Sequence, residues 1–364
     1  MSKAREVAKL GEVMTNGQIG GRRNLIINGA MQVAQRATTA SFAGSGGGYV
    51  SLDRFKTYSN GGGALTLSQE TDVPSGEGFK NSMKVTVNTA DSSIATGDYY
   101  VLQQNIEGNA CSHLMQGTAN AETITISFYV KSSLTGNFGG ALNNNAANRS
   151  YPFQYTIDSA NTWQKITKTI TLDTSGTWAT NNTIGLRLQW DFGSGATFQG
   201  TANAWASANY HTAPSSVQLI GTNSATWFVT GFQIEVGEVA TPFEHRSYGD
   251  ELYSCQRYFE VSGTGSDNPS GWNFGGMSTE VCHNTGYIPG QQFAVEKRTN
   301  PTVVIYSRNG NSGKVSAFNT GSDEGNGHAI NSVKKTGFHA VQRDGGTYTT
   351  GQGYEYGYTA DAEL

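Results

Sequence analysis

The sequence predicts an all-β protein: a jelly-roll β-sandwich, then a smaller C-terminal β domain, with one short helix at the N-terminus. Three observations lead to this prediction. Short runs alternate apolar and polar residues, turn-forming residues separate the runs, and the composition suits strands and turns. The 364 residues include 47 Gly, 16 Phe, 17 Tyr and 6 Trp, and only 14% are charged. Because a disordered chain is poor in aromatic residues, we expect this one to fold around a core.

Residues 1–22 are predicted to form an anchor, which consists of a helix followed by a Gly-rich hinge. Apolar side chains in the helix recur at i, i+3 and i+7, which places them on one face. A lone helix of this length is marginal in water, so we expect it to need a partner. The predicted attachment residues are this apolar face and two basic neighbours: Lys3, Arg5, Val7, Leu10 and Met14.

Residues 23–246 are predicted to form the sandwich, because alternation with a period of two dominates them. The run 124–131 (ITISFYVK) is one example, and 184–192 (IGLRLQWDF) is another. Turns rich in Gly, Asn and Ser, such as 143–149, separate the runs. One apolar and one polar face per strand indicates antiparallel sheets that are covered on one side.

The alternation breaks near residue 246 and resumes in 247–364, which is long enough for a second, distal β domain. The segment 247–259 (SYGDELYSCQRYF) is predicted to form a short helix or turn that links the two domains. The terminal run places three tyrosines on one face of a strand: Tyr354, Tyr356 and Tyr358.

Charge and cysteine content exclude several classes of protein. A net charge of −4 does not suit a nucleic-acid partner. No apolar run approaches the length of about 18 residues that membrane insertion needs. The N-terminus lacks the apolar stretch of a signal peptide, so we expect synthesis in the cytoplasm and delivery by an assembly. The three cysteines, which suit neither a disulfide framework nor a zinc site, are expected to be buried thiols: Cys111, Cys255 and Cys282.

No catalytic motif is present, so the sequence predicts a protein that is not an enzyme and has no cofactor. No ligand spacing identifies a metal site, and the question of a structural calcium ion stays open. The six histidines are scattered singly. The glycine run 44–48 is not followed by a helical pattern, which favours a flexible loop over a phosphate site. A glycosidase would need paired carboxylates. Asp191 lies in an aromatic run, but on the polar side of its strand, so a solvated or turn position is favoured.

Aromatic residues supply the candidate ligand contacts, because phenol and indole rings stack on the apolar faces of sugars. Trp190 shares its strand face with Leu188 and Phe192 and is predicted to be core, as is Trp227. Trp205 and Tyr210 lie in a loop-like run, where packing that anchors the loop is the slightly favoured alternative. The candidate glycan-binding residues are Trp178, Trp205, Tyr210, Tyr354, Tyr356 and Tyr358.

Several segments together resemble the tail-fibre proteins of marine and cyanobacterial bacteriophages, including their domains related to carbohydrate-binding modules. These segments are RRNLIINGAMQVAQR (22–36), SLDRF (51–55), VLQQNIEG (101–108), ISFYVKSS (126–133), NTWQKITKTI (161–170), DTSGTW (173–178), LRLQWDFGSG (186–195) and TGFQIEVGEVATPFEHRSYGDELYSCQRYF (230–259). The run 293–319 resembles the C-terminal β domain common at the ends of such fibres.

The resemblance implies a virion component, usually a homotrimer, that attaches by its N-terminus to other phage proteins of the tail or capsid. Its distal part would adhere to a glycan on the host surface, for host attachment and receptor binding. The resemblance carries over no ligand residues. Two alternatives remain open: a purely structural virion protein of the neck, baseplate or capsid surface, and a polysaccharide depolymerase.

Overall fold

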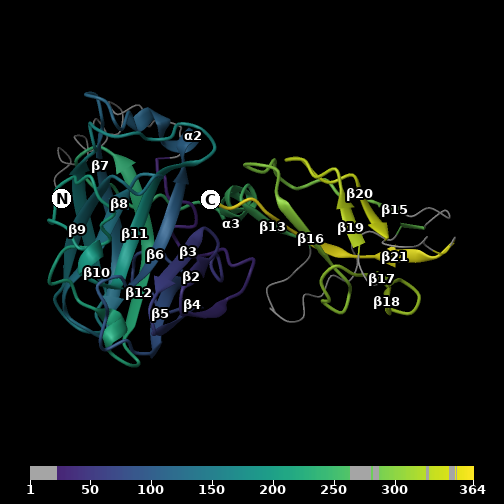
Figure 1. The fold of residues 1–364 in the computed structure, drawn as a ribbon, viewed down its shortest axis with the longest axis horizontal. Coiled ribbons are helices and arrows are strands. Elements are labelled where there is room, and N and C mark those ends of the chain that lie inside the picture. The colour runs from purple at the N-terminus through teal and green to yellow at the C-terminus, as the bar shows by residue number, and fades with distance from the viewer. Residues whose placement is uncertain (1–22, 263–279, 282–286, 325–327, 344–348, 350) are drawn as a thin grey trace. The chain divides into compact units, whose positions relative to one another are not determined.

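The computed structural model describes residues 23–262, 280–281, 287–324, 328–343, 349 and 351–364 (Figure 1). The predicted N-terminal anchor, with Lys3, Arg5, Val7, Leu10 and Met14, lies outside the described residues, as does Cys282. The chain divides into two compact units. We call them the sandwich unit, which is the chain up to Gln32 with Thr39–Val50 and Phe55–Arg246, and the C-terminal unit, which is Val33–Thr38, Ser51–Arg54 and Ser247–Leu364.

The sandwich unit consists of two six-stranded antiparallel sheets (Figure 1). One sheet has the strand order β1 (Thr39–Ala43), β4 (Ala64–Glu70), β5 (Ser82–Thr89), β12 (Thr226–Val236), β7 (Thr123–Ser132) and β10 (Gln164–Thr171). The other has the order β2 (Gly46–Gly48), β3 (Phe55–Asn60), β6 (Tyr99–Glu107), β11 (Ile184–Ser194), β8 (Gly136–Asn143) and β9 (Ser150–Ile157). Consecutive strands such as β5 and β6, or β7 and β8, lie in different sheets, as in a jelly roll. The predicted all-β class is therefore confirmed.

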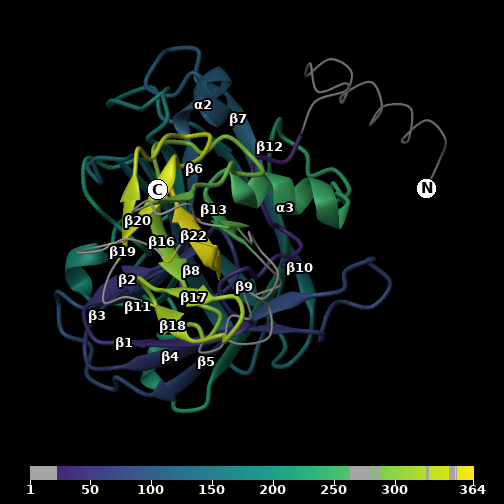
Figure 2. The same ribbon diagram turned by 90° about the vertical axis from the view of Figure 1, so that its right-hand side faces the viewer.

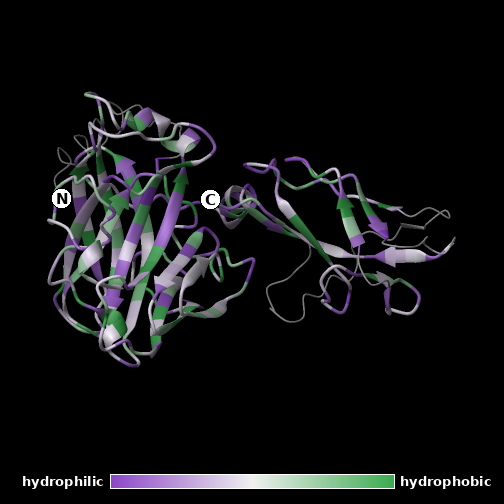
Figure 3. Cartoon of the chain, in the orientation of Figure 1, coloured by the Kyte–Doolittle hydropathy of each residue, from purple (hydrophilic) through white to green (hydrophobic). Residues whose placement is uncertain are grey.

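The alternation of the sequence explains why these strands pair into a sandwich. Figure 3 shows hydrophobic and hydrophilic residues following one another along the strands. The inward side chains form an aromatic core, in which the rings of Trp190 and Phe232 lie 3.9 Å apart and Phe128 meets Trp190 edge to face. The indole nitrogen of Trp227 donates a hydrogen bond of 3.0 Å to the hydroxyl of Tyr155. Trp190 and Trp227 are core residues, as predicted.

Short helices occupy the connections of the described chain. They are α2 (Gly108–Cys111), η1 (Ser112–Leu114), η2 (Ala196–Phe198), η3 (Leu219–Gly221) and α3 (Tyr248–Gln256). Helix α3 begins where the alternation breaks. The Ser247 side chain accepts a hydrogen bond of 3.2 Å from the backbone nitrogen of Asp250, which satisfies a free donor of the first turn. None of the described helices is long and apolar enough to cross a membrane.

The C-terminal unit contains three small antiparallel sheets (Figures 1 and 2). The first is β13 (Phe259–Val261), β22 (Gly357–Asp361) and β16 (Thr302–Tyr306). The second is β14 (Glu280–Val281), β21 (Gly353–Glu355), β17 (Val315–Ala317) and β18 (Asp323–Glu324), and the third is β15 (Tyr287–Pro289), β20 (Ala340–Arg343) and β19 (His328–Asn331). Their shared core includes Phe293, Phe338 and Val341.

Two segments from the first part of the sequence belong to the C-terminal unit, although the predicted sandwich range of 23–246 included them. Polar contacts explain the grouping. The Gln35 side chain donates to the backbone oxygen of Phe259, at 2.8 Å. Arg54 forms an ion pair with Glu363, and its guanidinium lies 3.6 Å from the centre of the Tyr258 ring. Alternation along a strand carries no signal for such side-chain pairs.

Candidate functional site

The outward face of the sheet that contains β3, β6 and β11 carries mostly polar and aromatic residues. Strand register places Lys56 opposite Gln103, Gln103 opposite Gln189, and Asn105 opposite Arg187. Since residues that pair across strands share a face, these side chains lie on the same side of the sheet. We define the polar face as Tyr49, Lys56, Tyr58, Tyr99, Gln103, Asn105, Arg187 and Gln189.

Two tyrosines form an aromatic platform on the polar face. The rings of Tyr58 and Tyr99 lie 5.1 Å apart, tilted by 32°, and Tyr58 is 40% exposed. Tyr99 is held from its other side by Phe198 at 5.0 Å and His211 at 5.2 Å. The Tyr58 ring also lies against the backbone of strand β2. A Cβ atom at Gly47 would overlap this ring and the Thr57 carbonyl, which explains the glycine there.

Gly47 corrects one prediction. The glycine run 44–48 was expected to be a flexible loop, but residues 46–48 form the edge strand β2, which pairs with β3. Glycine is needed at 47 because the polar face approaches the backbone closely.

Hydrogen bonds fix the amide groups of the polar face. The Gln103 amide donates to Gln189 at 3.0 Å, and Gln189 donates to the backbone oxygen of Tyr210 at 3.3 Å. Asn105 donates to the hydroxyl of Tyr49 at 3.1 Å. All three residues are buried, with exposures of 6% for Gln103 and 1% for Asn105 and Gln189. Their bonds therefore support Tyr49 and Arg187 from beneath and do not themselves face a ligand.

Arg187 gives the polar face a positive charge. Its Nε donates to the side-chain oxygen of Asn105 at 3.1 Å. Burial lowers its pKa, which the nearby phenols of Tyr49 and Tyr58 partly oppose. Within the described part of the chain, no carboxylate forms an ion pair with Arg187. A partly desolvated cation without a carboxylate partner is costly for folding, so its presence indicates a role toward an outside group.

Asp191 lies on the same side of β11 but is buried, with only 1% of its surface exposed. The Ser194 hydroxyl donates to it at 2.5 Å, and burial raises its pKa to about 7. The expectation of a solvated position is therefore wrong. The physical reason is that Thr212, in the connection between β11 and β12, packs against Gly139, the strand neighbour of Asp191.

The predicted tryptophans of the connecting loops are engaged in packing. Trp178 is buried, and its ring meets Trp205 edge to face at 5.6 Å. The Trp205 indole nitrogen donates to the backbone oxygen of Thr171, and that of Trp178 donates to Ser175, both at 2.9 Å. Tyr210 is partly buried, and its ring lies where a side chain at Gly200 would be. It borders the polar face through its backbone oxygen.

The three C-terminal tyrosines were predicted to contact a ligand, and the structure contradicts this. Tyr354, Tyr356 and Tyr358 are core residues. The Tyr356 hydroxyl donates to the backbone of Pro289, and the Tyr358 hydroxyl donates to Glu260, both at 2.7 Å. Their rings are therefore covered by neighbouring side chains and cannot stack on a ligand.

The structure also shows the state of the cysteines and of the side chains that could hold a metal ion. Cys111 and Cys255 are buried free thiols there, as predicted. No group of three or more His, Cys, Asp or Glu side chains suited to a metal ion occurs among the residues that the structure describes.

The comparisons with known proteins concern fold. No protein-family model matches the sequence, and no curated protein matches it. Solved structures that resemble the chain include the enzymatically active domain of tailspike protein 4 of bacteriophage CBA120, with a TM-score of 0.32 and 11% identity over 59% of this chain. The match spans 21% of that protein's chain.

Two further similar structures are matched over their whole chains. A putative sugar-binding protein from Bacteroides thetaiotaomicron has a TM-score of 0.32 and 10% identity, covering 59% of this chain and 100% of its own. The family 11 carbohydrate-binding module of a Clostridium thermocellum cellulase has a TM-score of 0.27 and 14% identity, covering 56% of this chain and 100% of its own. The description of the polar face rests on the residues of this chain and not on these similar structures.

Proposed function

We propose that this protein is a non-catalytic adhesion protein that binds a saccharide on the polar face of its sandwich unit. The observation that carries the proposal is the exposed ring of Tyr58, paired with Tyr99 and bordered by the guanidinium of Arg187. Sugar rings present apolar CH faces to aromatic rings, and their hydroxyl groups bond to guanidinium donors.

The charge of the polar face favours an acidic saccharide. Arg187 has a guanidinium with donors beyond the Nε that bonds Asn105, and a planar fork of donors matches a carboxylate or sulfate group. The Lys56 ammonium, 5.7 Å from the centre of the Tyr49 ring, adds a second positive charge. The ligand class is therefore a glycan that carries carboxylate or sulfate groups.

The biological setting that we propose rests on the resemblance of segments 22–36, 51–55 and 230–259 to phage tail-fibre proteins. In that setting the protein is part of a virion, attached through residues 1–22 to other phage proteins and assembled as a homotrimer. Several weak sites on one particle would raise the avidity for a host surface through effective concentration.

The test is binding of the full chain to a glycan array that holds neutral, carboxylated and sulfated oligosaccharides. We expect acidic oligosaccharides to be retained by the unaltered protein and by the control variant Tyr253→Ala, whose tyrosine on α3 is 56% exposed. Tyr58→Ala is expected to weaken the retention of acidic oligosaccharides by about tenfold. Retention of acidic oligosaccharides that Tyr58→Ala leaves unchanged would contradict the proposed site, and failure to retain any saccharide would contradict the function.

Two further measurements address the setting and the chemistry. Deletion of residues 1–22 should leave glycan binding intact and abolish incorporation into particles. New reducing ends after incubation with a bound polysaccharide would show a depolymerase and overturn the non-catalytic proposal.

A further inference from the structure

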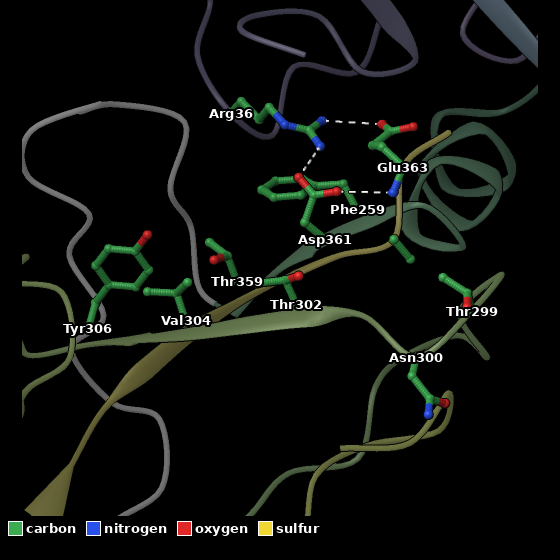
Figure 4. Close-up of a pocket in the computed structure, with 11 residues that line it drawn as sticks. Arg36, Phe259, Thr299, Asn300, Thr302, Val304, Tyr306, Thr359, Asp361 and Glu363 are labelled. Carbon is green, nitrogen blue, oxygen red and sulfur yellow. Dashed lines mark hydrogen bonds and ion pairs between the residues drawn. The ribbon is translucent and has the colours of Figure 1, made fainter. Parts of the chain in front are cut away.

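The C-terminal unit contains a cavity of about 680 Å³ (Figure 4). This volume lies within the range of about 300–1,000 Å³ typical of ligand pockets. One wall is the sheet of β13, β22 and β16, in which Asp361 pairs with both Phe259 and Thr302, and Thr359 pairs with Val304. Residues that pair across strands share a face, so these side chains line the cavity together.

Asp361 is held in a fixed orientation at one end of this wall. One carboxylate oxygen accepts a hydrogen bond of 3.2 Å from Arg36, and the other accepts one of 3.0 Å from the backbone nitrogen of Glu363 (Figure 4). The guanidinium of Arg36 lies 3.6 Å from the centre of the Phe259 ring, which fixes its own position. Each carboxylate oxygen can accept more than one hydrogen bond, so Asp361 keeps acceptor capacity for a ligand.

The exposure of the charged groups decides which charge a ligand in the cavity can carry. The Asp361 side chain is 45% exposed, whereas Arg36 is 10% exposed and Glu363 is 5% exposed. A molecule that enters the cavity therefore meets a carboxylate, while the neighbouring charges are covered. A negatively charged ligand would be repelled, and a ligand with neighbouring hydroxyl groups would donate to both oxygens.

The other end of the wall is aromatic. Tyr306 lies four residues along β16 from Thr302, which is about 13 Å of extended strand. Figure 4 shows Val304 between them, and Thr299 and Asn300 on the neighbouring segment. The cavity therefore offers an oriented acceptor at one end, a phenol ring at the other, and hydroxyl and amide groups along its side.

We infer that this cavity is a second saccharide-binding site, which takes a neutral sugar longer than one ring, with adjacent hydroxyl groups on Asp361 and an apolar ring face on Tyr306. The inference is carried by the cavity alone and does not depend on the polar face of the sandwich unit. The two sites would differ in the charge of the saccharide they accept.

The test is saturation-transfer difference NMR of the full chain with lactose, maltose and cellobiose at millimolar concentration, and with the acidic chondroitin disaccharide for comparison. The protein carries Tyr58→Ala, so that the polar face does not contribute. We expect at least one neutral disaccharide to receive magnetisation from the protein. We expect Tyr306→Ala to weaken its binding at least about tenfold, since the aromatic contact is lost.

A control variant and a second cavity variant distinguish a loss of binding from a loss of folding. Tyr253→Ala removes an exposed tyrosine elsewhere in the C-terminal unit and is expected to leave the signal unchanged. Asn300→Ala lies on the cavity but touches no ion pair, and it should weaken the signal while the thermal unfolding curve stays the same. The inference is overturned if no neutral disaccharide shows a signal that Tyr306→Ala removes, or if the acidic disaccharide binds better than the neutral ones.

Discussion

Two cations, one in each unit, are held in different ways. In the sandwich unit, Arg187 borders the polar face and has no carboxylate partner among the described residues. In the C-terminal unit, Lys297 is buried and pairs with Glu260 at 2.5 Å. A paired buried charge serves structure, whereas an unpaired one at a surface indicates a ligand. The two residues are therefore expected to differ in their effects on stability and on binding.

The largest effect is expected from breaking the buried pair of the C-terminal unit. Lys297 has no exposed surface, and its ammonium group also donates to the backbone oxygen of Gln256 at 2.6 Å. Lys297→Ala leaves the Glu260 carboxylate buried without its counter-charge, which is expected to lower the free energy of unfolding by about 3–5 kcal/mol. Urea unfolding measures it. The exposed Lys335→Ala serves as control, and a loss as small as the control's would mean that the pair does not hold the unit together.

The next effect concerns Asp191, the buried carboxyl of β11 whose pKa is raised. Its pKa of about 7 in the folded protein lies above the unfolded value of 3.8. The folded state therefore binds the proton more tightly, so the free energy of unfolding falls as pH rises from about 4 to 7 and is level above that range. The cost at pH 8 is at most about 4 kcal/mol, as the difference in pKa implies.

Asp191→Asn removes this titration and is expected to make the protein more stable than the unaltered chain at pH 8 but not at pH 4. Urea unfolding at both pH values checks the prediction, with the exposed Asp158→Asn as the matched control. Equal stabilities of variant and parent at pH 8 would show that Asp191 is charged at no cost.

A smaller effect is expected from the aromatic platform of the sandwich unit. Tyr58→Ala should weaken binding of an acidic oligosaccharide by about tenfold, or about 1.4 kcal/mol, because the stacking surface is lost. Tyr58→Phe keeps the ring and should retain most of the affinity. Isothermal titration calorimetry distinguishes the two variants, and equal losses would mean that the hydroxyl, not the ring, contacts the ligand.

The smallest effect tests the charge of the polar face. Binding of an acidic oligosaccharide to the unaltered protein should weaken as salt is raised, because ions screen the attraction to Arg187. Arg187→Gln should reduce this salt dependence without lowering the free energy of unfolding, since it removes a desolvated cation. Lys165→Gln, on the opposite sheet, is the control. A salt dependence that both variants retain would place the anionic contact elsewhere.

The sequence predicted the sandwich core better than the sites, and particular residues show why. Alternation identifies Trp190 and Trp227 as core because their neighbours on the same face are apolar. The same rule places Tyr354, Tyr356 and Tyr358 on one face but cannot say which side is covered, and the structure buries that side. The prediction of a solvated position for Asp191 was wrong for the converse reason, because the connection between β11 and β12 covers it.

The polar face depends on pairing between strands far apart in the sequence. Tyr58 and Tyr99 are separated by 41 positions, and Arg187 follows Tyr99 by a further 88. Alternation marks only Arg187 as outward-facing, because it lies between Leu186 and Leu188, whereas Tyr58 lies between the polar residues Thr57 and Ser59. Only the register of β3, β6 and β11 shows that they are neighbours.

Tyrosine-ring NMR of the full chain, with and without a carboxylated or sulfated oligosaccharide, tests the central claim most directly. The account predicts that the ring signals of Tyr58 and Tyr99 shift on addition of the ligand, while those of Tyr354, Tyr356 and Tyr358 stay in place. Shifts confined to other tyrosines, or no shift with any acidic oligosaccharide, would contradict the assignment of the polar face as the binding site.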